Sequence, residues 1–380
     1  MGNSSNKSPA FITLAEKGEN HVICVSNTLV EGIKLVTYSD GSIYKGAFVN
    51  DERNGKGKMK YANGDVYEGD WKNDKRDGNG EIKFSNNAIY IGAWKNNEFH
   101  GQGKIEYNTG EVYNGEWLDG LKEGHSHTKY VDGSIYEGQY KNNKRNGQGT
   151  VTYNDGSSYD GEWKNSERDG QGKMTYKDGS SYDGEWKNGE IDGQGILKHK
   201  NGSIYEGELK KGKMDGKGTL KHIDDDSTYV GEWKNDKKDG KGKMTFRDGY
   251  NYEGEWKNDK RYGKGKITYS DGDIYEGEWK NNNSDGKGTQ KYISGDFYDG
   301  EWKNGLKDGE GCMIYANHNV YRGQWSNSSY NGLGTYTFFE DNMKCIGSWV
   351  NNKPIMVTWQ DLRYVEALTP VVNEIKPQEI

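Results

Sequence analysis

The sequence predicts an all-β protein, built as an elongated, twisted, single-layer antiparallel meander of β-hairpins with degenerate capping units at its ends. Three observations predict this fold: a motif that recurs every 23 residues, side chains that alternate between apolar and charged within each copy, and prolines that stand only at positions 9, 354, 370 and 377. Proline removes a hydrogen-bond donor from a strand, so its absence from residues 10–353 favours a continuous ladder.

The recurring motif begins with an aromatic residue and is found in fourteen copies. Its first position is occupied by Tyr44, Tyr67, Tyr90, Tyr113, Tyr136, Tyr159, Tyr182, Tyr205, Tyr229, Tyr252, Tyr275, Tyr298, Tyr321 and, in the last copy, Cys345. The step is 23 residues except at two single-residue insertions, in the stretches HIDDDSTY and FFEDNMK. A fixed period of this length indicates a repeat architecture with one supersecondary element per copy.

Each copy holds two stretches with the two-residue alternation of a β-strand. Residues 252–258 place Tyr, Gly and Trp on one face, and residues 263–269 place Gly, Gly, Ile and Tyr on one face. Dipeptides such as Asp271-Gly272 follow the second stretch and predict hairpin turns in which both central residues have positive φ. Glycine weakens a strand unless something needs the space, so we expect Tyr or Trp rings to lie across these glycines as a thin aromatic core.

The opposite face carries charges that we expect to pair across the ladder. Strands that carry acids, such as Glu253 and Glu255, alternate along the chain with strands that carry lysines, such as Lys241/Lys243 and Lys264/Lys266. Each such pair contributes about 0.2–1 kcal/mol. The 28 Tyr and 12 Trp, with a net charge of only -7, indicate a folded chain in spite of its low hydropathy.

The pattern Y-x-G-x-W-x-N-x-x-x-x-G-x-G-x-x-x-Y-x-[DN]-G at this period resembles the MORN repeat (membrane occupation and recognition nexus), over residues 31–353. The resemblance implies an elongated, twisted sheet of hairpins, and twenty-eight strands would extend for about 130 Å. It also implies a non-enzymatic role, because repeat-only MORN proteins of protists act as scaffolds, and some long arrays dimerise through their ends.

The ends of the array differ from its middle. We expect a flexible leader at residues 1–17, a degenerate capping unit at 18–30, the repeat array at 31–353, and a capping strand with a tail at 354–380. The capping strand contains Ile355, Val357 and Trp359, whose side chains are apolar. We expect this edge strand either to be covered by the tail at residues 360–380 or to pair with a second copy of the chain. We therefore predict a homodimer.

The sequence indicates neither catalytic nor metal chemistry. Cys24, Cys312 and Cys345 are too scattered for a disulfide framework or a zinc site, which suits a cytoplasmic protein. The Gly-x-Gly motifs do not precede helices, so they do not predict phosphate binding. We expect no enzyme activity, no cofactor, no metal and no nucleic-acid partner. Irregular units at His125–His127 and Asp224–Asp226 are interpreted as local variation, with a functional break as the alternative.

The N-terminus suggests a lipid anchor. Met1-Gly2-Asn3-Ser4-Ser5-Asn6 presents Gly2 as a candidate myristoylation site, although Asn6 occupies the position where Ser or Thr is preferred. One myristoyl chain gives only marginal, reversible membrane binding. Direct phospholipid binding by the repeats is a weaker expectation, because their lysines stand among at least as many acidic residues.

We therefore expect a scaffold that organises protein partners at a membrane-associated cytoskeletal structure, in the cytoplasm and peripheral to the membrane. The alternative is a regulatory module whose aromatic groove binds a partner peptide or a phospholipid head group. The groove candidates are the rings of the middle units: Tyr159, Trp163, Tyr182, Trp186, Tyr252, Trp256, Tyr275 and Trp279. The opposing interpretation is that these rings are buried against the glycines and leave no face for a partner.

Overall fold

The computed structural model describes residues 22–30 and 32–364, which form β-strands joined by short turns and end in one 3₁₀ turn. The chain divides into two compact units, Met1–Asp169 and Gly170–Ile380, with the division inside one strand, and each unit is described separately. The predicted all-β class is confirmed, as is the antiparallel meander.

The first unit contains thirteen strands and the beginning of a fourteenth. They are β1 (Val22–Val30), β2 (Ile33–Tyr38), β3 (Ile43–Val49), β4 (Glu52–Lys60), β5 (Val66–Lys72), β6 (Lys75–Lys83), β7 (Ile89–Lys95), β8 (Glu98–Glu106), β9 (Val112–Leu118), β10 (Leu121–Lys129), β11 (Ile135–Lys141), β12 (Lys144–Thr152), β13 (Ser158–Lys164) and β14 (Glu167–Thr175). From β1 to β13, each strand pairs antiparallel with the next.

The second unit continues the same pattern from the end of β14. It contains β15 (Ser181–Lys187), β16 (Glu190–Lys198), β17 (Ile204–Lys210), β18 (Lys213–Lys221), β19 (Thr228–Lys234), β20 (Lys237–Thr245), β21 (Asn251–Lys257), β22 (Lys260–Thr268), β23 (Ile274–Lys280), β24 (Asn283–Lys291), β25 (Phe297–Lys303), β26 (Leu306–Ile314), β27 (Val320–Ser326), β28 (Ser329–Phe338), β29 (Met343–Val350), β30 (Lys353–Asp361) and the 3₁₀ turn Leu362–Tyr364. Consecutive strands from β14 to β30 pair antiparallel.

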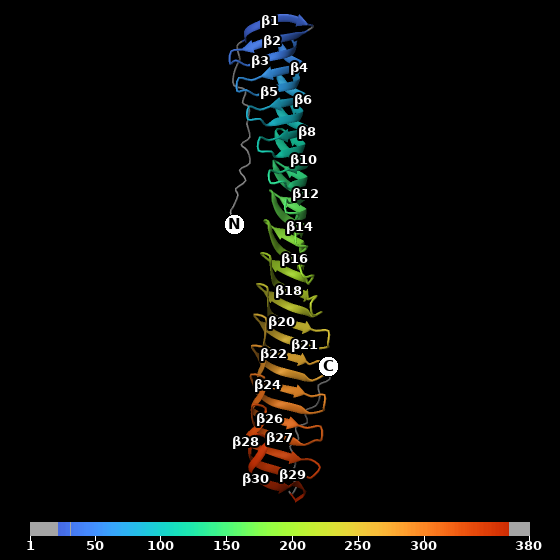
Figure 1. The fold of residues 1–380 in the computed structure, drawn as a ribbon, viewed down its shortest axis with the longest axis vertical. Coiled ribbons are helices and arrows are strands. Elements are labelled where there is room, and N and C mark those ends of the chain that lie inside the picture. The colour runs from blue at the N-terminus through green and yellow to red at the C-terminus, as the bar shows by residue number, and fades with distance from the viewer. Residues whose placement is uncertain (1–21, 31, 365–380) are drawn as a thin grey trace. The chain divides into compact units, whose positions relative to one another are not determined.

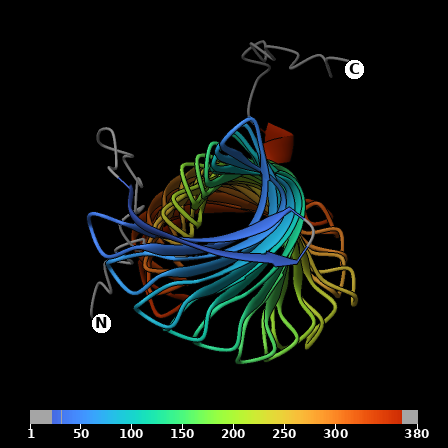
Figure 2. The same ribbon diagram turned by 90° about the horizontal axis from the view of Figure 1, so that it is seen from above.

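Within each unit the strands lie side by side in chain order (Figure 1). From above, successive hairpins of a unit are turned relative to one another, so that their loops fan out, blue to green in the first unit and yellow to red in the second (Figure 2). This is the twist expected between neighbouring β-strands.

The two kinds of turn are arranged differently from the prediction. The two-residue turns are Asn-Asp and related pairs within a copy, such as Asn258 (φ 48°) and Asp259 (φ 66°) between β21 and β22. Asp271-Gly272 instead lies in a wider loop, closed by Tyr269 N–H to Asp273 O (2.8 Å) and Gly272 N–H to Tyr269 O (3.0 Å). There φ is positive at Gly272 (98°) and not at Asp271, as in a type I turn followed by a left-handed residue.

Candidate functional site

The aromatic rings of each first strand come together over the glycine that lies between them. Tyr252 and Trp256 stand four residues apart on β21, a separation of about 13 Å along a straight strand. Their ring centroids are only 5.1 Å apart, at an interplanar angle of 89°. Gly254 lies between them on β21, and the Tyr252 hydroxyl lies 2.5 Å from the place where a Cβ on Gly254 would stand.

The polar atoms of these rings are also engaged. The Tyr252 hydroxyl donates to the carbonyl of Glu255 (2.9 Å), and Trp256 Nε1 donates to the carbonyl of Gly242 on the preceding strand (3.1 Å). The same two bonds recur along the array, for example at Tyr275 and Trp279. Each ring pair therefore links its own strand to the strand of the preceding copy.

The rings predicted as groove residues belong to this core. Their exposed fractions lie between 0% and 8%, for Tyr159, Trp163, Tyr182, Trp186, Tyr252, Trp256, Tyr275 and Trp279. Burial to this degree leaves no ring face of this set free for a partner. The interpretation of the rings as packing residues therefore describes the structure, and we do not base a binding site on them.

The two glycines of each Gly-x-Gly motif have different roles. The prediction was that both make room for an aromatic ring, and this is correct only for the second. At the second glycine, Gly265, an added Cβ would come within 2.6 Å of Tyr252 Cε2. The first, Gly263, has positive φ (65°) and faces the carboxylate of Glu255. The pairing register of β21 and β22 shifts here, and the freed N–H of Lys264 donates to Glu255 Oε1 (3.1 Å). A bulge leaves a backbone N–H without a carbonyl opposite it, so a side-chain oxygen has to accept the hydrogen bond instead.

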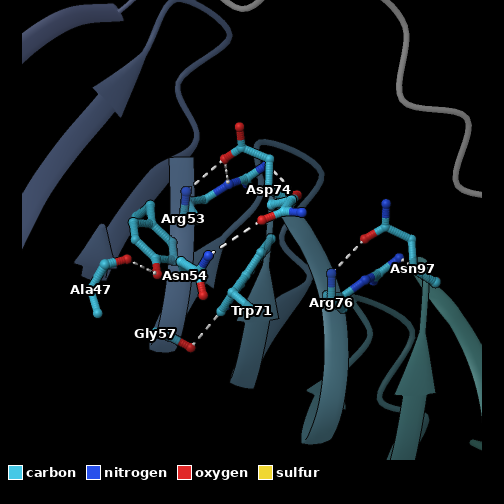
Figure 3. A network of polar contacts seen from close by, with 10 residues as sticks. Ala47, Arg53, Asn54, Gly57, Trp71, Asp74, Arg76 and Asn97 are labelled. Atoms are coloured by element: carbon cyan, nitrogen blue, oxygen red, sulfur yellow. Dashed lines mark hydrogen bonds and ion pairs between the residues drawn. The ribbon is translucent and has the colours of Figure 1, made fainter. Parts of the chain in front are cut away.

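The turns of one copy are bonded to the second strand of the copy before it. Arg53 of β4 donates its backbone N–H and its Nε to Asp74 Oδ1, both at 2.9 Å, and Asp74 N–H donates to the carbonyl of Arg53 (3.1 Å). Arg76 and Asn97 repeat the arrangement one copy later, with a backbone bond of 2.8 Å (Figure 3). These bonds explain why Asn, Asp or Ser stands so often at the second turn position.

A row of residues that the sequence interpretation missed lies against the rings. We call it the cage row: the second residue of every second strand from β4 to β28, that is Arg53, Arg76, Phe99, Lys122, Arg145, Arg168, Ile191, Met214, Lys238, Arg261, Ser284, Lys307 and Tyr330. Eight of the thirteen members are Arg or Lys, and most of these lie over a tryptophan ring, as at Arg53 Cζ, 4.3 Å from the Trp71 ring, and Arg145 Cζ, 3.9 Å from the Trp163 ring. The signal was the recurrence of Arg or Lys at the 23-residue step.

The opposite face carries the predicted cross-strand charges. Glu253 lies opposite Lys243 on one side and Lys266 on the other, and Lys243 Nζ is 3.5 Å from its carboxylate. Lys58 and Glu68 form the equivalent pair at 2.9 Å in the first unit. These side chains are more than half exposed, so each pair contributes little to stability.

The irregular unit at His125–His127 has a polar core. Thr128 is fully buried where most other copies have Ile, Leu, Met or Val, and its hydroxyl lies 3.4 Å from the Tyr140 hydroxyl. Tyr140 replaces tryptophan, and its hydroxyl lies 3.1 Å from that of Tyr130. His127 Nε2 lies 3.6 Å from Glu137 on the charged face. Within residues 22–30 and 32–364, no three His, Cys, Asp or Glu side chains are placed to share a metal.

The insertion at Asp224–Asp226 is absorbed in a loop between β18 and β19. Asp225 Oδ1 accepts the N–H of Ser227 (3.0 Å), and Asp226 takes a positive φ of 54°. Strands β18 and β19 keep the register of other copies, with Gly218 opposite Gly231.

The last strand, β30, presents the apolar residues predicted at the dimer edge. Ile355 is 58% exposed, Trp359 is 56% exposed, and Val357 is half-buried. Among the described strands, β30 pairs with β29 alone. The candidate lipidation site, Gly2, lies outside the described residues.

Comparison with protein families gives one clear result. The MORN-repeat model matches thirteen consecutive segments, beginning with residues 44–66 and ending with residues 321–343. The chain belongs to the MORN-repeat family. This is a family of non-catalytic binding repeats. The fourteenth predicted copy, which begins at Cys345, lies beyond the matched segments although β29 and β30 continue the ladder.

Other comparisons add little to the MORN assignment. No curated protein matches the sequence. Among solved structures, the chain is similar to the TCP10 domain of Danio rerio CPAP in complex with a STIL peptide, at 11% identity over 67% of this chain and 93% of that one, with a TM-score of 0.27. It is also similar to the SAS-4 (dCPAP) TCP domain of Drosophila melanogaster in complex with a proline-rich motif of Ana2, at 18% identity over 45% and 93%, again with a TM-score of 0.27. Similarities this weak carry no argument about partners.

The described part of this MORN-repeat chain holds no helix long and apolar enough to cross a bilayer.

Proposed function

We propose that this MORN-repeat protein is a non-catalytic scaffold that self-associates through β30 and organises protein partners at a membrane-associated cytoskeletal structure in the cytoplasm. The observation that carries the proposal is the pair of exposed apolar side chains, Ile355 and Trp359, on a strand that pairs with β29 alone among the described strands. A strand edge of this kind is a template for pairing with another chain.

The charged face also changes character beside this edge. Leu333, Ile346 and Met356 stand on β28, β29 and β30 at 66%, 38% and 75% exposure. Ile346 lies opposite Thr335 on β28 and Thr358 on β30, so the charge pairs of the preceding copies give way to uncharged residues here. An uncharged surface next to an open edge supports association at this end.

The test is the molar mass in solution, from size-exclusion chromatography with light scattering. The 43.0 kDa chain is expected to elute as a dimer at micromolar concentration, and the double variant Ile355→Lys/Trp359→Lys as a monomer. Ile293→Lys is the matched control, since Ile293 is an exposed apolar residue (75%) in a loop away from β30. A wild-type monomer, or a dimer that survives the double variant, contradicts the proposal.

A lipid on Gly2 is the second part of the proposal, and it rests on the N-terminal sequence. A single acyl chain binds membranes marginally, and a dimer would bring two chains to the same surface. Metabolic labelling with a clickable myristate analogue is expected to mark the wild type and not Gly2→Ala. Equal membrane fractionation of the two proteins contradicts this part alone.

A further inference from the structure

A groove lies on the charged face of the first unit, across strands β2 to β7, and has a volume of about 770 Å³. Its floor is the bare backbone of glycines that lie opposite one another on consecutive strands, from Gly46 on β3 to Gly92 on β7. Its walls are the side chains of Ile33, Lys45, Lys56, Lys58, Glu68, Asn79 and Ile91. All of these wall residues are exposed, so the groove is open to solvent.

Two lysines of the groove lie directly opposite each other. Lys45 on β3 faces Lys58 on β4, and the other cross-strand neighbour of Lys45 is apolar. Lys58 forms an ion pair with Glu68 (2.9 Å) and Lys56 forms one with Asp70 (2.7 Å), whereas Lys45 forms none with a carboxylate of the described residues. Like charges directly opposite on neighbouring strands are destabilising. The groove therefore holds a positive charge that the sheet itself does not compensate.

This pair of lysines departs from the pattern of the repeat. The residue that follows the first aromatic position is acidic or uncharged in every other copy except at Arg322, whose two cross-strand neighbours are uncharged. In the second unit, for example, Lys243 faces Glu253. The start of the array thus lacks the acid that neutralises the charged face elsewhere, and an anionic group from outside the array can take its place.

We propose that this groove binds residues 365–380 of a second copy of the chain, with the Glu374 carboxylate set between the ammonium groups of Lys45 and Lys58. The sequence of this segment, VEALTPVVNEIKPQEI, carries three glutamates and one lysine among apolar residues. Residues 1–21, by contrast, carry two glutamates and two lysines and offer no such complementarity. The inference does not depend on the proposed association through β30.

The spacing along the segment favours Glu374 as the contact. Neighbouring strands lie about 4.8 Å apart, so Ile33 on β2 is about 7 Å along the groove from the midpoint between the two lysines. Alternate side chains of an extended peptide are also about 7 Å apart, which brings Val372 to Ile33 when Glu374 meets the lysines. From Ile33 to Ile91 the groove extends over five strand spacings, about 24 Å, a length that seven or eight extended residues span.

The other glutamates of the segment fit less well. Glu366 has an apolar residue, Leu368, at the same spacing, but the rest of the groove would then have to hold residues 362–364, which form the 3₁₀ turn. Glu379 has Pro377 two residues before it in place of an aliphatic side chain. A carboxylate between two ammonium groups also relieves their mutual repulsion, so this contact gains more than an isolated surface ion pair.

The contact joins residues 365–380 of one copy to β2–β7 of the next, so it is heterologous and can add copies one after another. Pairing at β30 alone stops at a dimer. Because a short segment in an open groove buries little surface, we expect this linkage only at concentrations well above those at which the dimer forms.

The test is the binding of a fluorescently labelled peptide of residues 365–380 to the full chain, followed by fluorescence anisotropy. The Glu374→Gln peptide is expected to bind at least fivefold more weakly than the unchanged peptide, and the matched Glu366→Gln peptide within twofold of it. In the chain, Lys45→Glu is expected to weaken binding at least tenfold. Lys243→Glu makes the same charge change on the same face in the second unit and is expected to leave binding within twofold of the wild type.

A gain of binding separates the contact from a loss caused by misfolding. Glu68→Lys removes the acid from the groove walls and is expected to tighten binding at least threefold, whereas Glu253→Lys, at the same position of a later copy, is expected to leave it unchanged. Circular dichroism checks that all variants are folded.

Three outcomes overturn the proposal: equal binding of the Glu374→Gln and Glu366→Gln peptides, binding unchanged in both Lys45→Glu and Glu68→Lys, or a scrambled peptide of the same composition that binds as tightly as the unchanged one. The last would show a groove for any acidic peptide. None of these outcomes bears on association through β30, which the double variant Ile355→Lys/Trp359→Lys tests separately.

Discussion

The Tyr252 ring lies across the backbone of Gly265 on the neighbouring strand, at the place where any larger residue would put its Cβ. The contact recurs in other copies, as between Tyr275 and Gly288 or Tyr298 and Gly311. Ring and glycine together determine how the second strand docks on the first, because only this register puts the bare backbone under the ring.

Gly265→Ala is expected to lower the free energy of unfolding by about 1–3 kcal/mol, the usual cost of overpacking a buried site. The added methyl would overlap the Tyr252 ring, which is almost fully buried and has no room to move aside. Urea denaturation followed by tryptophan fluorescence measures the loss. Lys266→Ala, on the charged face of the same strand, is the control and should shift the midpoint little; equal shifts would show that the ring contact is not the cause.

The acid at the bulge should be replaceable by an amide but not by alanine. Glu255 Oε1 accepts the Lys264 N–H, and Gln139 does the same for the Gln148 N–H at 3.1 Å. Glu255→Gln is therefore expected to keep wild-type stability, while Glu255→Ala loses about 0.5–1.5 kcal/mol, the net value of one hydrogen bond. Thermal unfolding of the two variants, Glu255→Gln and Glu255→Ala, measures this difference in stability. If the glutamine variant loses as much as the alanine variant, the carboxylate charge and not the hydrogen bond is what matters.

The sequence was sufficient to predict the repeat, the strands, the buried rings and the opposed charges, because all of these follow from periodicity. It was not sufficient to distinguish the two turns. Asn258-Asp259 and Asp271-Gly272 both tolerate positive φ, and the loop lengths emerge only when the ring contacts set the strand register. The bulge at Glu255 was also missed, since an alternating pattern contains no mark of the extra residues opposite it.

The cage row was missed for a different reason. Its members stand at the start of the second strand, ahead of the Gly-x-Gly motif, and are of mixed type, from Arg53 to Phe99 and Ser284. From the sequence alone, a cation at this position is indistinguishable from a solvated turn residue. Only the structure shows that it lies over the tryptophan of the next copy, as Arg53 does over Trp71.

The two-residue turns supply a third prediction, at Asp259. This residue has a positive φ of 66°, and its Oδ1 accepts the N–H of Lys238 at 2.9 Å. Asp259→Asn keeps both properties and should be neutral. Asp259→Gly keeps the turn and loses the hydrogen bond, and Asp259→Ala loses both, with a left-handed alanine adding about 1 kcal/mol of strain. The urea midpoint is expected to be highest for the asparagine variant, lower for the glycine variant and lowest for the alanine variant. An alanine variant as stable as the glycine variant would contradict this order.

Lys307 supplies a prediction about pH. Its pKa falls from 10.5 in the unfolded chain to about 8 in the folded one, mainly because burial disfavours the charged form, and the charge of Asp296 opposes this only in part. Between these values the unfolded chain binds the proton more tightly, so the free energy of unfolding should rise with pH; below about pH 8 the ammonium is present in both states and the contribution is constant.

Lys307→Met removes the titrating group and keeps the space filled, as Met214 does in its own copy. The urea midpoint of the wild type, measured between about pH 7 and 9.5, is expected to rise relative to that of the variant once the pH exceeds about 8. Tyr292 faces the same ammonium, but burial raises its pKa to about 12, and its contribution is common to both proteins. Parallel curves over the whole range would show that the Lys307 ammonium is no harder to bury than to solvate.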